Sequence, residues 1–226
     1  MKYENIYKGI FIERPNRFIA RCLIYGEEIT VHVKNTGRCR ELLITGAEVY
    51  LEKSNNPNRK TQFDLIAVKK GENLINMDSQ CPNIAAKEWL EDGHWIKNPT
   101  LVKPESRYGN SRIDFYLENK SEKAFVEVKG VTLEEDGRAM FPDAPTERGT
   151  KHINELIKAK KEGYKTAVMF VIQMKGIKEF LPNEKTDKAF ADALRKAKEN
   201  GVEILAYDCI VNPDSMHIDK KIPVKL

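Results

Sequence analysis

The chain has 226 residues, of which 41% are hydrophobic and 32% charged, a balance typical of a soluble globular protein rather than of a disordered one. The length accommodates one large domain or two of ordinary size. The net charge of +4 is too small to prove a polyanionic partner, although residues 1–82 hold 13 Lys/Arg against 10 Asp/Glu and so carry most of the excess. We see no signal peptide and no apolar run near the ~20 residues of a membrane span, so we expect a cytoplasmic protein.

The cysteines and histidines do not suggest a zinc site. The four cysteines are far apart, form no CxxC pair and have no zinc spacing with the four histidines. We therefore expect free, buried thiols.

Residues 5–79 are predicted to form short strands. The β-rich segments are 6–13, 17–25, 28–34, 47–53 and 61–69, with a further extended segment near Leu74 and a tight turn at Tyr25-Gly26. Residues 35–43 are expected to be a loop that enters a short helix. Five strands with a short helix between the third and the fourth are typical of a small closed barrel of the oligonucleotide/oligosaccharide-binding (OB) type. We assign this OB-like, nucleic-acid-binding barrel to residues 1–82.

Barrels of this type bind single strands with a basic groove and aromatic stacking platforms. The candidate binding residues in the barrel are Arg14, Arg17, Phe18, His32, Lys34, Arg38, Arg40, Arg59 and Lys60. The alternative is that the charged residues are ordinary solvated loop residues and that Phe18 belongs to the barrel core. The turn from Asn35 to Arg38 is the most specific-looking piece.

A domain boundary is expected near residue 80, where Cys81-Pro-Asn83 interrupts the strand pattern. Asn83 is predicted to cap a helix over 84–92 that Gly93 stops. Pro99 and Pro104 are expected to break the chain after it. Residues 83–226 would then form the second domain.

The stretch on which the second domain depends is a predicted hairpin. Apolar and polar residues alternate in 111–117 and 124–129, and the polar run 118–123 suits the turn between these strands. Glu127 and Lys129, two apart, project from one face of their strand. Closing the hairpin brings Asp114 beside both. Gly130 follows at once and permits a close backbone approach or a bulge beside a site.

Two carboxylates and a lysine at one place form a reactive set. Facing carboxylates repel one another, and Mg²⁺, which favours one or two carboxylates, removes the repulsion. Lys129 beside the metal could orient or deprotonate a water, or stabilise charge on phosphorus. Glu105 offers a third carboxylate, and Arg107 and Arg112 supply phosphate-binding forks. The alternative is that Asp114, Glu127 and Lys129 are merely solvated strand residues.

The rest of the chain predicts a mixed sheet with helices on both sides. A hairpin over 131–140 and a rigid loop over 141–145 precede a helix that Thr146 caps and that ends at Gly163; its basic N-terminal turn suits phosphate. The candidates there are Arg148, Lys151 and His152. Taken alone, the charged face is expected to be solvated and His152 structural. A nearly continuous apolar strand over 166–172, a helix over 184–200 and a strand over 202–207 complete the α/β domain.

Four segments together make this chain resemble the sugar fermentation stimulation protein family, over essentially its whole length. They are Asn35–Arg38, Ser111–Phe115, Val126–Gly130 and Phe141–His152. The second half of that family is similar to restriction-endonuclease-like nucleases of the PD-(D/E)xK type, which carry an Asp on one strand and (Asp/Glu)-x-Lys on the next. Ile113 stands where a proline often precedes the Asp, a position without a chemical role.

The resemblance implies a role for each residue of the site. Asp114 and Glu127 would be ligands of Mg²⁺ or Mn²⁺, the carbonyl of Val128 would complete the shell, Lys129 would be the catalytic lysine, and Glu105 would be the assisting acid. The resemblance also implies DNA binding.

Two functions from different classes remain open. One is a Mg²⁺-dependent nuclease in which the barrel holds a strand and the second domain cuts it. The other is a non-catalytic DNA-binding regulator of sugar utilisation on a nuclease scaffold. The presence of all three of Asp114, Glu127 and Lys129 favours the nuclease. A carbohydrate-binding barrel also fits the fold and explains the carboxylate–lysine site poorly.

Overall fold

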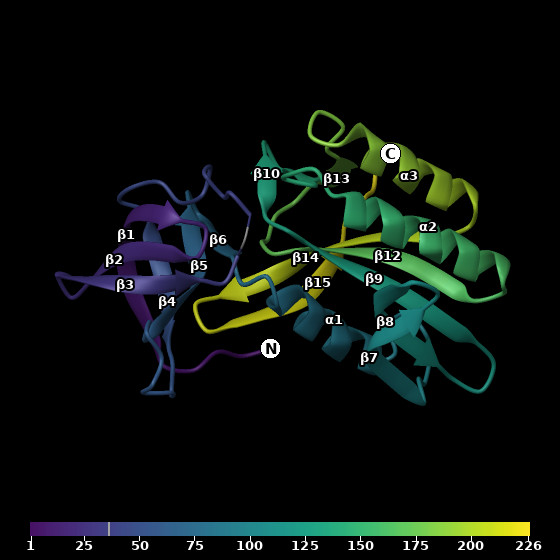
Figure 1. The fold of residues 1–226 in the computed structure, drawn as a ribbon, viewed down its shortest axis with the longest axis horizontal. Helices are drawn as coiled ribbons and strands as arrows, with labels where there is room; N and C mark the ends of the chain where they lie inside the picture. The colour runs from purple at the N-terminus through teal and green to yellow at the C-terminus, as the bar shows by residue number, and fades with distance from the viewer. Residues whose placement is uncertain (36) are drawn as a thin grey trace.

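The N-terminal part of the chain is a closed barrel. The computed structural model describes residues 1–35 and 37–226. Its first six strands are β1 (Ile6–Asn16), β2 (Ile19–Ile24), β3 (Glu27–Val33), β4 (Glu48–Lys53), β5 (Phe63–Lys70) and β6 (Asn73–Asn76), in the sheet order β3-β2-β1-β4-β5-β6. A parallel pairing of β3 with β5, at His32↔Asp64 and Val33↔Leu65, closes β1–β5 into a barrel (Figure 1). The predicted OB-like barrel is confirmed.

The prediction of a short helix within residues 35–43 is wrong. The described residues of this segment form turns and no helix, and Thr36 of the Asn35–Arg38 turn lies outside the described residues. The backbone N–H of Gly37 donates to Oδ1 of Asn35 at 2.7 Å, an Asx turn. The guanidinium of Arg14 donates to main-chain carbonyls of Asn35, Gly37 and Arg38 at 2.6–2.9 Å. Carbonyls that a helix would use are therefore taken by a side chain.

The second part of the chain is a six-stranded mixed sheet in the order β15-β14-β12-β9-β8-β7, covered by helices on both sides (Figure 1). Its strands are β7 (Leu101–Tyr108), β8 (Ser111–Glu118), β9 (Lys123–Val131), β12 (Lys165–Ile172), β14 (Glu203–Asn212) and β15 (Ser215–Lys221). Helix α1 (Cys81–Glu91) covers one face, and α2 (Glu147–Lys161) and α3 (Lys188–Glu199) cover the other. A small sheet joins β10 (Leu133–Glu135), β11 (Arg138–Phe141) and β13 (Glu179–Pro182). The predicted mixed-sheet α/β domain is confirmed.

Several element boundaries differ from those predicted. Pro104 does not break the chain but lies inside β7, where its missing N–H is tolerated because β7 is an edge strand. Helix α1 begins at Cys81 with Gln80 as its N-cap, because Pro82 suits a first turn. Helix α3 begins later than predicted, after Asp187, whose carboxylate accepts from the N–H of Phe190 at 2.9 Å. Strands β7, β13 and β15 were not predicted as separate elements.

Other local predictions are confirmed. Thr146 caps α2, its hydroxyl accepting from the N–H of Gly149 at 3.1 Å. All four cysteines are buried and free. Burial raises the pKa of Cys22 and of Cys81 to about 12, so these thiols are unreactive. No helix in the described part of the chain is long and apolar enough to cross a membrane.

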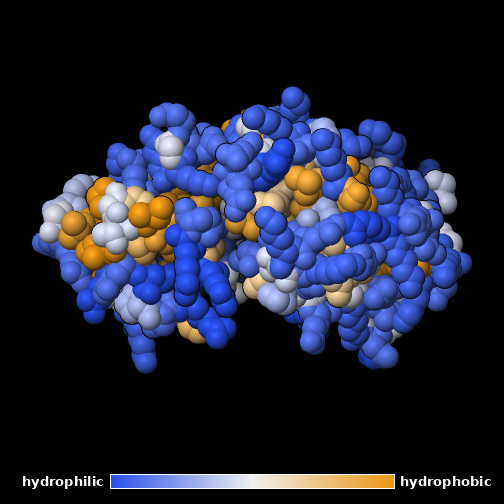
Figure 2. All heavy atoms as spheres, turned by 90° about the horizontal axis from the view of Figure 1, so that it is seen from above, coloured by the Kyte–Doolittle hydropathy of each residue, from blue (hydrophilic) through white to orange (hydrophobic). Residues whose placement is uncertain are grey.

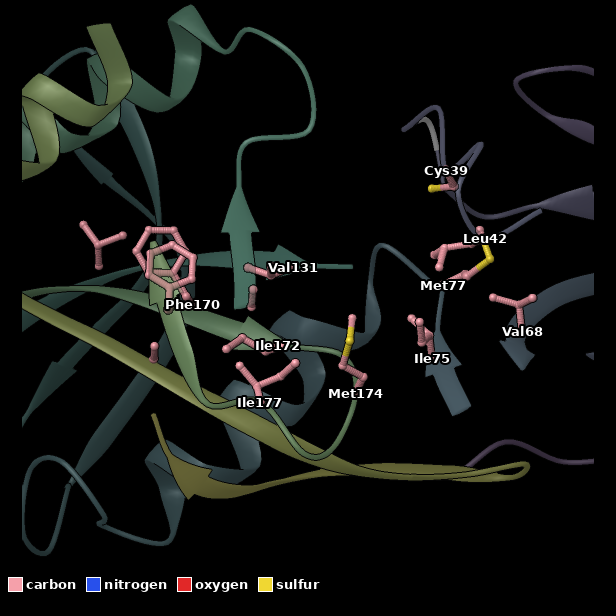
Figure 3. Packing of buried hydrophobic residues seen from close by; sticks show 14 of the residues in the cluster. Cys39, Leu42, Val68, Ile75, Met77, Val131, Phe170, Ile172, Met174 and Ile177 are labelled. Carbon is pink, nitrogen blue, oxygen red and sulfur yellow. The ribbon is translucent and has the colours of Figure 1, made fainter. Parts of the chain in front are cut away.

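One hydrophobic core joins the barrel to the second domain. Figure 3 shows Ile75, at the end of the barrel, facing Met174, which follows β12, with Met77 on the barrel side and Ile172 of β12 on the other side. All four side chains are fully buried in the same cluster. The two parts are therefore packed together rather than strung on a linker.

A buried polar network crosses the same junction. The amide Nε2 of Gln173, which is 2% exposed, lies 3.1 Å from the carbonyls of Asn76 and Asp78 and from Oδ1 of Asn76. The backbone N–H of Asn76 donates to the carbonyl of Gln173 at 2.9 Å. The hydroxyl of Tyr3 contacts both Asn76 and Asp78, and Lys34 pairs with Asp78 at 2.6 Å. These directional hydrogen bonds thus fix how the barrel and the second domain are aligned across the shared core.

Exposed apolar side chains gather on the barrel. Figure 2 shows the largest hydrophobic area of its view over the barrel end, on an otherwise mainly hydrophilic face. The exposed large hydrophobic residues of the barrel are Ile10, Phe18, Leu23, Tyr25 and Ile44. Phe18 is half exposed, so the alternative that it belongs to the barrel core is wrong.

We expect Gln173→Ala to lower the free energy of unfolding by about 2–3 kcal/mol, because it unpairs buried carbonyls at the junction. Urea unfolding followed by circular dichroism measures the change. Gln62→Ala is the matched control: Gln62 bonds the carbonyl of Arg59 at 2.8 Å in a loop that water reaches, so we expect a loss below about 1 kcal/mol. Equal losses would contradict a special role for the junction.

Candidate functional site

The site begins where the pairing of β8 with β9 ends. The two strands pair from Glu118↔Lys123 to Phe115↔Val126. Beyond that pair the N–H of Val128 donates instead to Oδ2 of Asp114, at 2.8 Å. The other oxygen of Asp114 accepts from Nδ2 of Asn83, in the first turn of α1, at 3.2 Å. The carboxylate of Asp114 is thereby held against the next strand.

Glu127 is the second carboxylate, and it is almost completely buried, with 2% of its surface exposed. Its Oε1 accepts from Nζ of Lys129 and lies at the same distance, 2.5 Å, from Nδ1 of His152 on α2. For the imidazole to donate here, Nδ1 must carry a proton. Oε2 of Glu127 is buried and has no partner. One oxygen therefore has two partners, and the other has none in the described structure.

The two carboxylates have opposite pKa shifts. Burial, and then the nearby charge of Glu127, raise the pKa of Asp114 above its ordinary range. Burial also opposes ionisation of Glu127, but the hydrogen bond from His152 and the charge of Lys129 outweigh it and hold the pKa of Glu127 below its ordinary range. The site therefore concentrates negative charge that a cation would relieve.

Backbone packing fixes the strand that carries these groups. A Cβ added to Gly130 would lie 2.6 Å from Cγ of Pro82 and 2.7 Å from Oε1 of Gln173. No side chain fits there without displacing one of them. The close approach predicted at Gly130 is confirmed, and it links Lys129 to α1 and to the junction with the barrel.

Glu105 lies on β7 at the edge of this cluster. The pairs Pro104↔Phe115 and Ser106↔Ile113 flank it and place it across from Asp114. Its carboxylate pairs with Arg112 at 3.1 Å, with both side chains about two-thirds exposed. In the described structure Glu105 thus pairs with Arg112 and does not join Asp114 and Glu127.

A cleft opens beside the site at the start of α2. It is lined by Asn110, Ser111, Arg112, Glu147, Arg148, Lys151 and His152. Arg148 is exposed, and Nζ of Lys151 donates to the carbonyl of Asn110 at 3.1 Å. The hydroxyl of Ser111 is buried without a partner. Three cations and an unpartnered hydroxyl suit a phosphate, and Arg107 lies exposed on the neighbouring strand.

The basic candidates of the barrel fall into two groups. Arg14 and Lys34 are occupied, by loop carbonyls and by Asp78 respectively. Arg17, Arg38 and Arg40 are exposed and line a second cleft, on the barrel side of the loop that contains Ala144. The guanidinium of Arg17 lies over the ring of Phe18, 5.6 Å from its centroid. His32 and Arg59 both bind Asp64.

The donor set fits a small divalent cation that brings its own waters. No group of three or more His, Cys, Asp or Glu side chains suited to a metal occurs among residues 1–35 and 37–226. Mg²⁺ needs only one or two carboxylates, since water and phosphate oxygens supply the rest. The unpartnered Oε2 of Glu127 offers one oxygen ligand, and the repulsion from Glu127, which after burial raises the pKa of Asp114, is one that a cation would relieve. The roles assigned to these residues stay predictions.

Two residues that touch the carboxylates were not predicted to do so. Asn83 was expected to be a helix cap and His152 a phosphate contact, yet each bonds to one of the carboxylates. The His152–Glu127 contact joins positions 25 apart on different elements, and no local pattern indicates it.

The fold and the site define a class: a two-domain protein with an OB-like barrel and a restriction-endonuclease-like domain. The model of the SfsA N-terminal OB domain matches residues 12–77, and that of the sugar fermentation stimulation protein RE domain matches residues 80–215. The chain belongs to the sugar fermentation stimulation protein family. The boundary that we place after residue 82 stays a prediction.

Relatives match over the full length of the chain. Sugar fermentation stimulation protein homologs of Ruminiclostridium cellulolyticum and Clostridium beijerinckii are each 58% identical over 226 residues, covering all of both chains. The solved structure of Pyrococcus furiosus SfsA in complex with Ca²⁺ is 28% identical, with a TM-score of 0.90, covering 100% of this chain and 98% of that one.

We expect Glu127→Gln to lower the pKa of Asp114, because it removes the negative charge that helps to raise it. The raised pKa means that ionised Asp114 costs stability: this cost is absent below about pH 4 and grows as the pH rises through the folded-state pKa. Carboxyl-carbon NMR titration without divalent cations measures the pKa. An unchanged value in the variant would show that the two carboxylates do not interact.

Proposed function

We propose that this protein is a metal-dependent phosphodiesterase that cleaves DNA at the Asp114–Glu127–Lys129 cluster. The observation that carries the proposal is the paired carboxylate arrangement, in which the buried Oε2 of Glu127 has no partner in the protein while Lys129 of the same strand pairs with the other oxygen, Oε1. A site with no chemical demand gains nothing from an unpaired buried oxygen, which costs about 1–3 kcal/mol.

The protein residues have separate roles in this proposal. Asp114, Glu127 and the carbonyl of Val128, which shares a strand edge with its N–H, would hold Mg²⁺ or Mn²⁺. A bound cation polarises the phosphate and lowers the pKa of a water. Lys129 would orient the attacking water and stabilise charge developing on the phosphate. Glu105 would assist once Arg112 turns to a phosphate.

The relative from Pyrococcus furiosus supports a divalent-cation site. Its solved structure is a Ca²⁺ complex, and its fold matches this chain from end to end. Ca²⁺ and Mg²⁺ both take oxygen ligands, although Ca²⁺ accepts more of them. We propose that the same fold presents its carboxylates to Mg²⁺ or Mn²⁺ in this protein.

The two basic clefts would hold the DNA on either side of the cluster. Arg112, Arg148 and Lys151 line the cleft beside Glu127, where phosphates approach the start of α2. Arg17, Arg38 and Arg40 line the cleft of the barrel, and Phe18 offers a half-exposed ring for a base. Arg14 would act indirectly, by holding the loop that carries Arg38.

We expect Lys129→Ala to reduce cleavage of labelled DNA by about 10²-fold or more, because it removes a charge positioned for the transition state. Single-stranded and duplex substrates are incubated with Mg²⁺ or Mn²⁺ and resolved on gels. Lys123→Ala, at the other end of the same strand, is the matched control and should cut like wild type.

Each other outcome has its own meaning. Equal cutting by wild type and Lys129→Ala would place the activity elsewhere. No cutting by wild type, with DNA binding intact, would support the non-catalytic regulator.

We expect Arg38→Ala to weaken DNA binding and to reduce the slope of log affinity against log salt by about 0.7–0.9, the share of one phosphate contact. Fluorescence anisotropy at several salt concentrations measures both quantities. Lys198→Ala, which removes one exposed charge from α3, is the control. An unchanged slope in Arg38→Ala would remove the barrel cleft from the DNA-binding surface.

A further inference from the structure

We infer that His152 is a positioning residue for the metal site: it fixes the orientation of the Glu127 carboxylate so that Oε2 faces the cation. This inference rests on the proposed function, because it assigns His152 a part in the same site. It replaces the expected role of His152 as a phosphate contact.

The geometry of the contact is that of a fixed donor. His152 is 5% exposed, and its Nδ1 lies 2.5 Å from Oε1 of Glu127. Helix α2, which carries it, is capped by Thr146 and anchored by the fully buried Ile153 and Leu156. The imidazole is therefore held by the helix and not by the cation site. With Nδ1 bound to Oε1, this edge of the ring serves the carboxylate and is not a metal ligand.

A glutamate needs such a donor because its terminal torsion is weakly restrained. The χ3 torsion of Glu is broad and roughly two-fold, so an unrestrained carboxylate exchanges its two oxygens. A hydrogen bond to Oε1 removes that freedom and leaves Oε2, which has no partner in the protein, as the oxygen presented. Hydrogen-bond partners of ligating carboxylates tune metal affinity in this way.

Lys129 cannot do this work alone. Its Nζ shares Oε1 of Glu127 with His152, at the same distance of 2.5 Å. If Lys129 turns toward a water or a phosphate during the reaction, it leaves Glu127. His152 has no such second task at Nδ1, so it keeps the carboxylate oriented after the lysine has moved.

The test measures Mn²⁺ affinity by titration calorimetry on the full chain without nucleic acid, since His152 also lines the phosphate cleft. Three variants are compared. In His152→Asn the amide nitrogen stands near the position of Nδ1 and can donate to Oε1; in His152→Gln it stands near Nε2 and cannot; His152→Phe keeps the bulk without a donor. We expect the Gln and Phe variants to lose about 10–100-fold in affinity, and the Asn variant to stay close to wild type.

Two controls separate positioning from structure and from adventitious binding. Thermal unfolding of each metal-free variant reports the structural cost of the substitution, which should not follow the order of the affinities. His217→Ala removes an exposed imidazole from β15 and should leave the affinity unchanged.

The outcomes separate this inference from the proposed function. If wild type binds Mn²⁺, Asp114→Asn does not, and His152→Phe binds like wild type, the inference fails while the metal site stands. If Asn and Phe lose affinity equally, in step with their loss of stability, His152 is merely structural and the inference fails. If wild type itself binds no Mn²⁺, the proposed function fails and the inference fails with it.

Discussion

The site depends on one interruption of a backbone ladder. If β8 and β9 remained paired past Phe115↔Val126, the N–H of Val128 would bond to a main-chain carbonyl and Asp114 would point away as an ordinary strand residue. Because the strands separate there, a carboxylate takes the place of that carbonyl. A gap in regular structure thus creates the geometry of the candidate site.

The elements around this gap divide the work of holding it. Helix α1 reaches Asp114 through Asn83, and α2 reaches Glu127 through His152, from opposite faces of the sheet. Each carboxylate therefore has one restraint from a neighbouring strand residue and one from a helix. These restraints act differently on ionisation: they hold the pKa of Glu127 below its ordinary range, whereas burial and the charge of Glu127 raise that of Asp114.

The sequence predicted what depends on local periodicity. The alternation of apolar and polar residues was enough to predict that Asp114, Glu127 and Lys129 lie together. Thr146 correctly indicated the start of α2. Contacts between elements far apart in the chain could not be predicted from local periodicity. Arg14 bonds to carbonyls of Asn35, Gly37 and Arg38, where a short helix was expected to begin. Pro104 was expected to break the chain, but an edge strand tolerates it. His152 contacts Glu127 only because α2 packs against the sheet.

The shared hydrophobic core and the close packing of Pro82 and Gln173 against Gly130 join the two parts of this protein into one unit. Gln173 bonds to the end of the barrel with its amide nitrogen, and its amide oxygen lies 2.7 Å from where a Cβ on Gly130, next to Lys129, would stand. Under the proposed function, a DNA strand bound to the barrel would exert its force on the residue next to Lys129. The proposed recognition in one part and the proposed chemistry in the other would then be connected through Gln173, and a barrel exchanged for another would have to recreate these contacts.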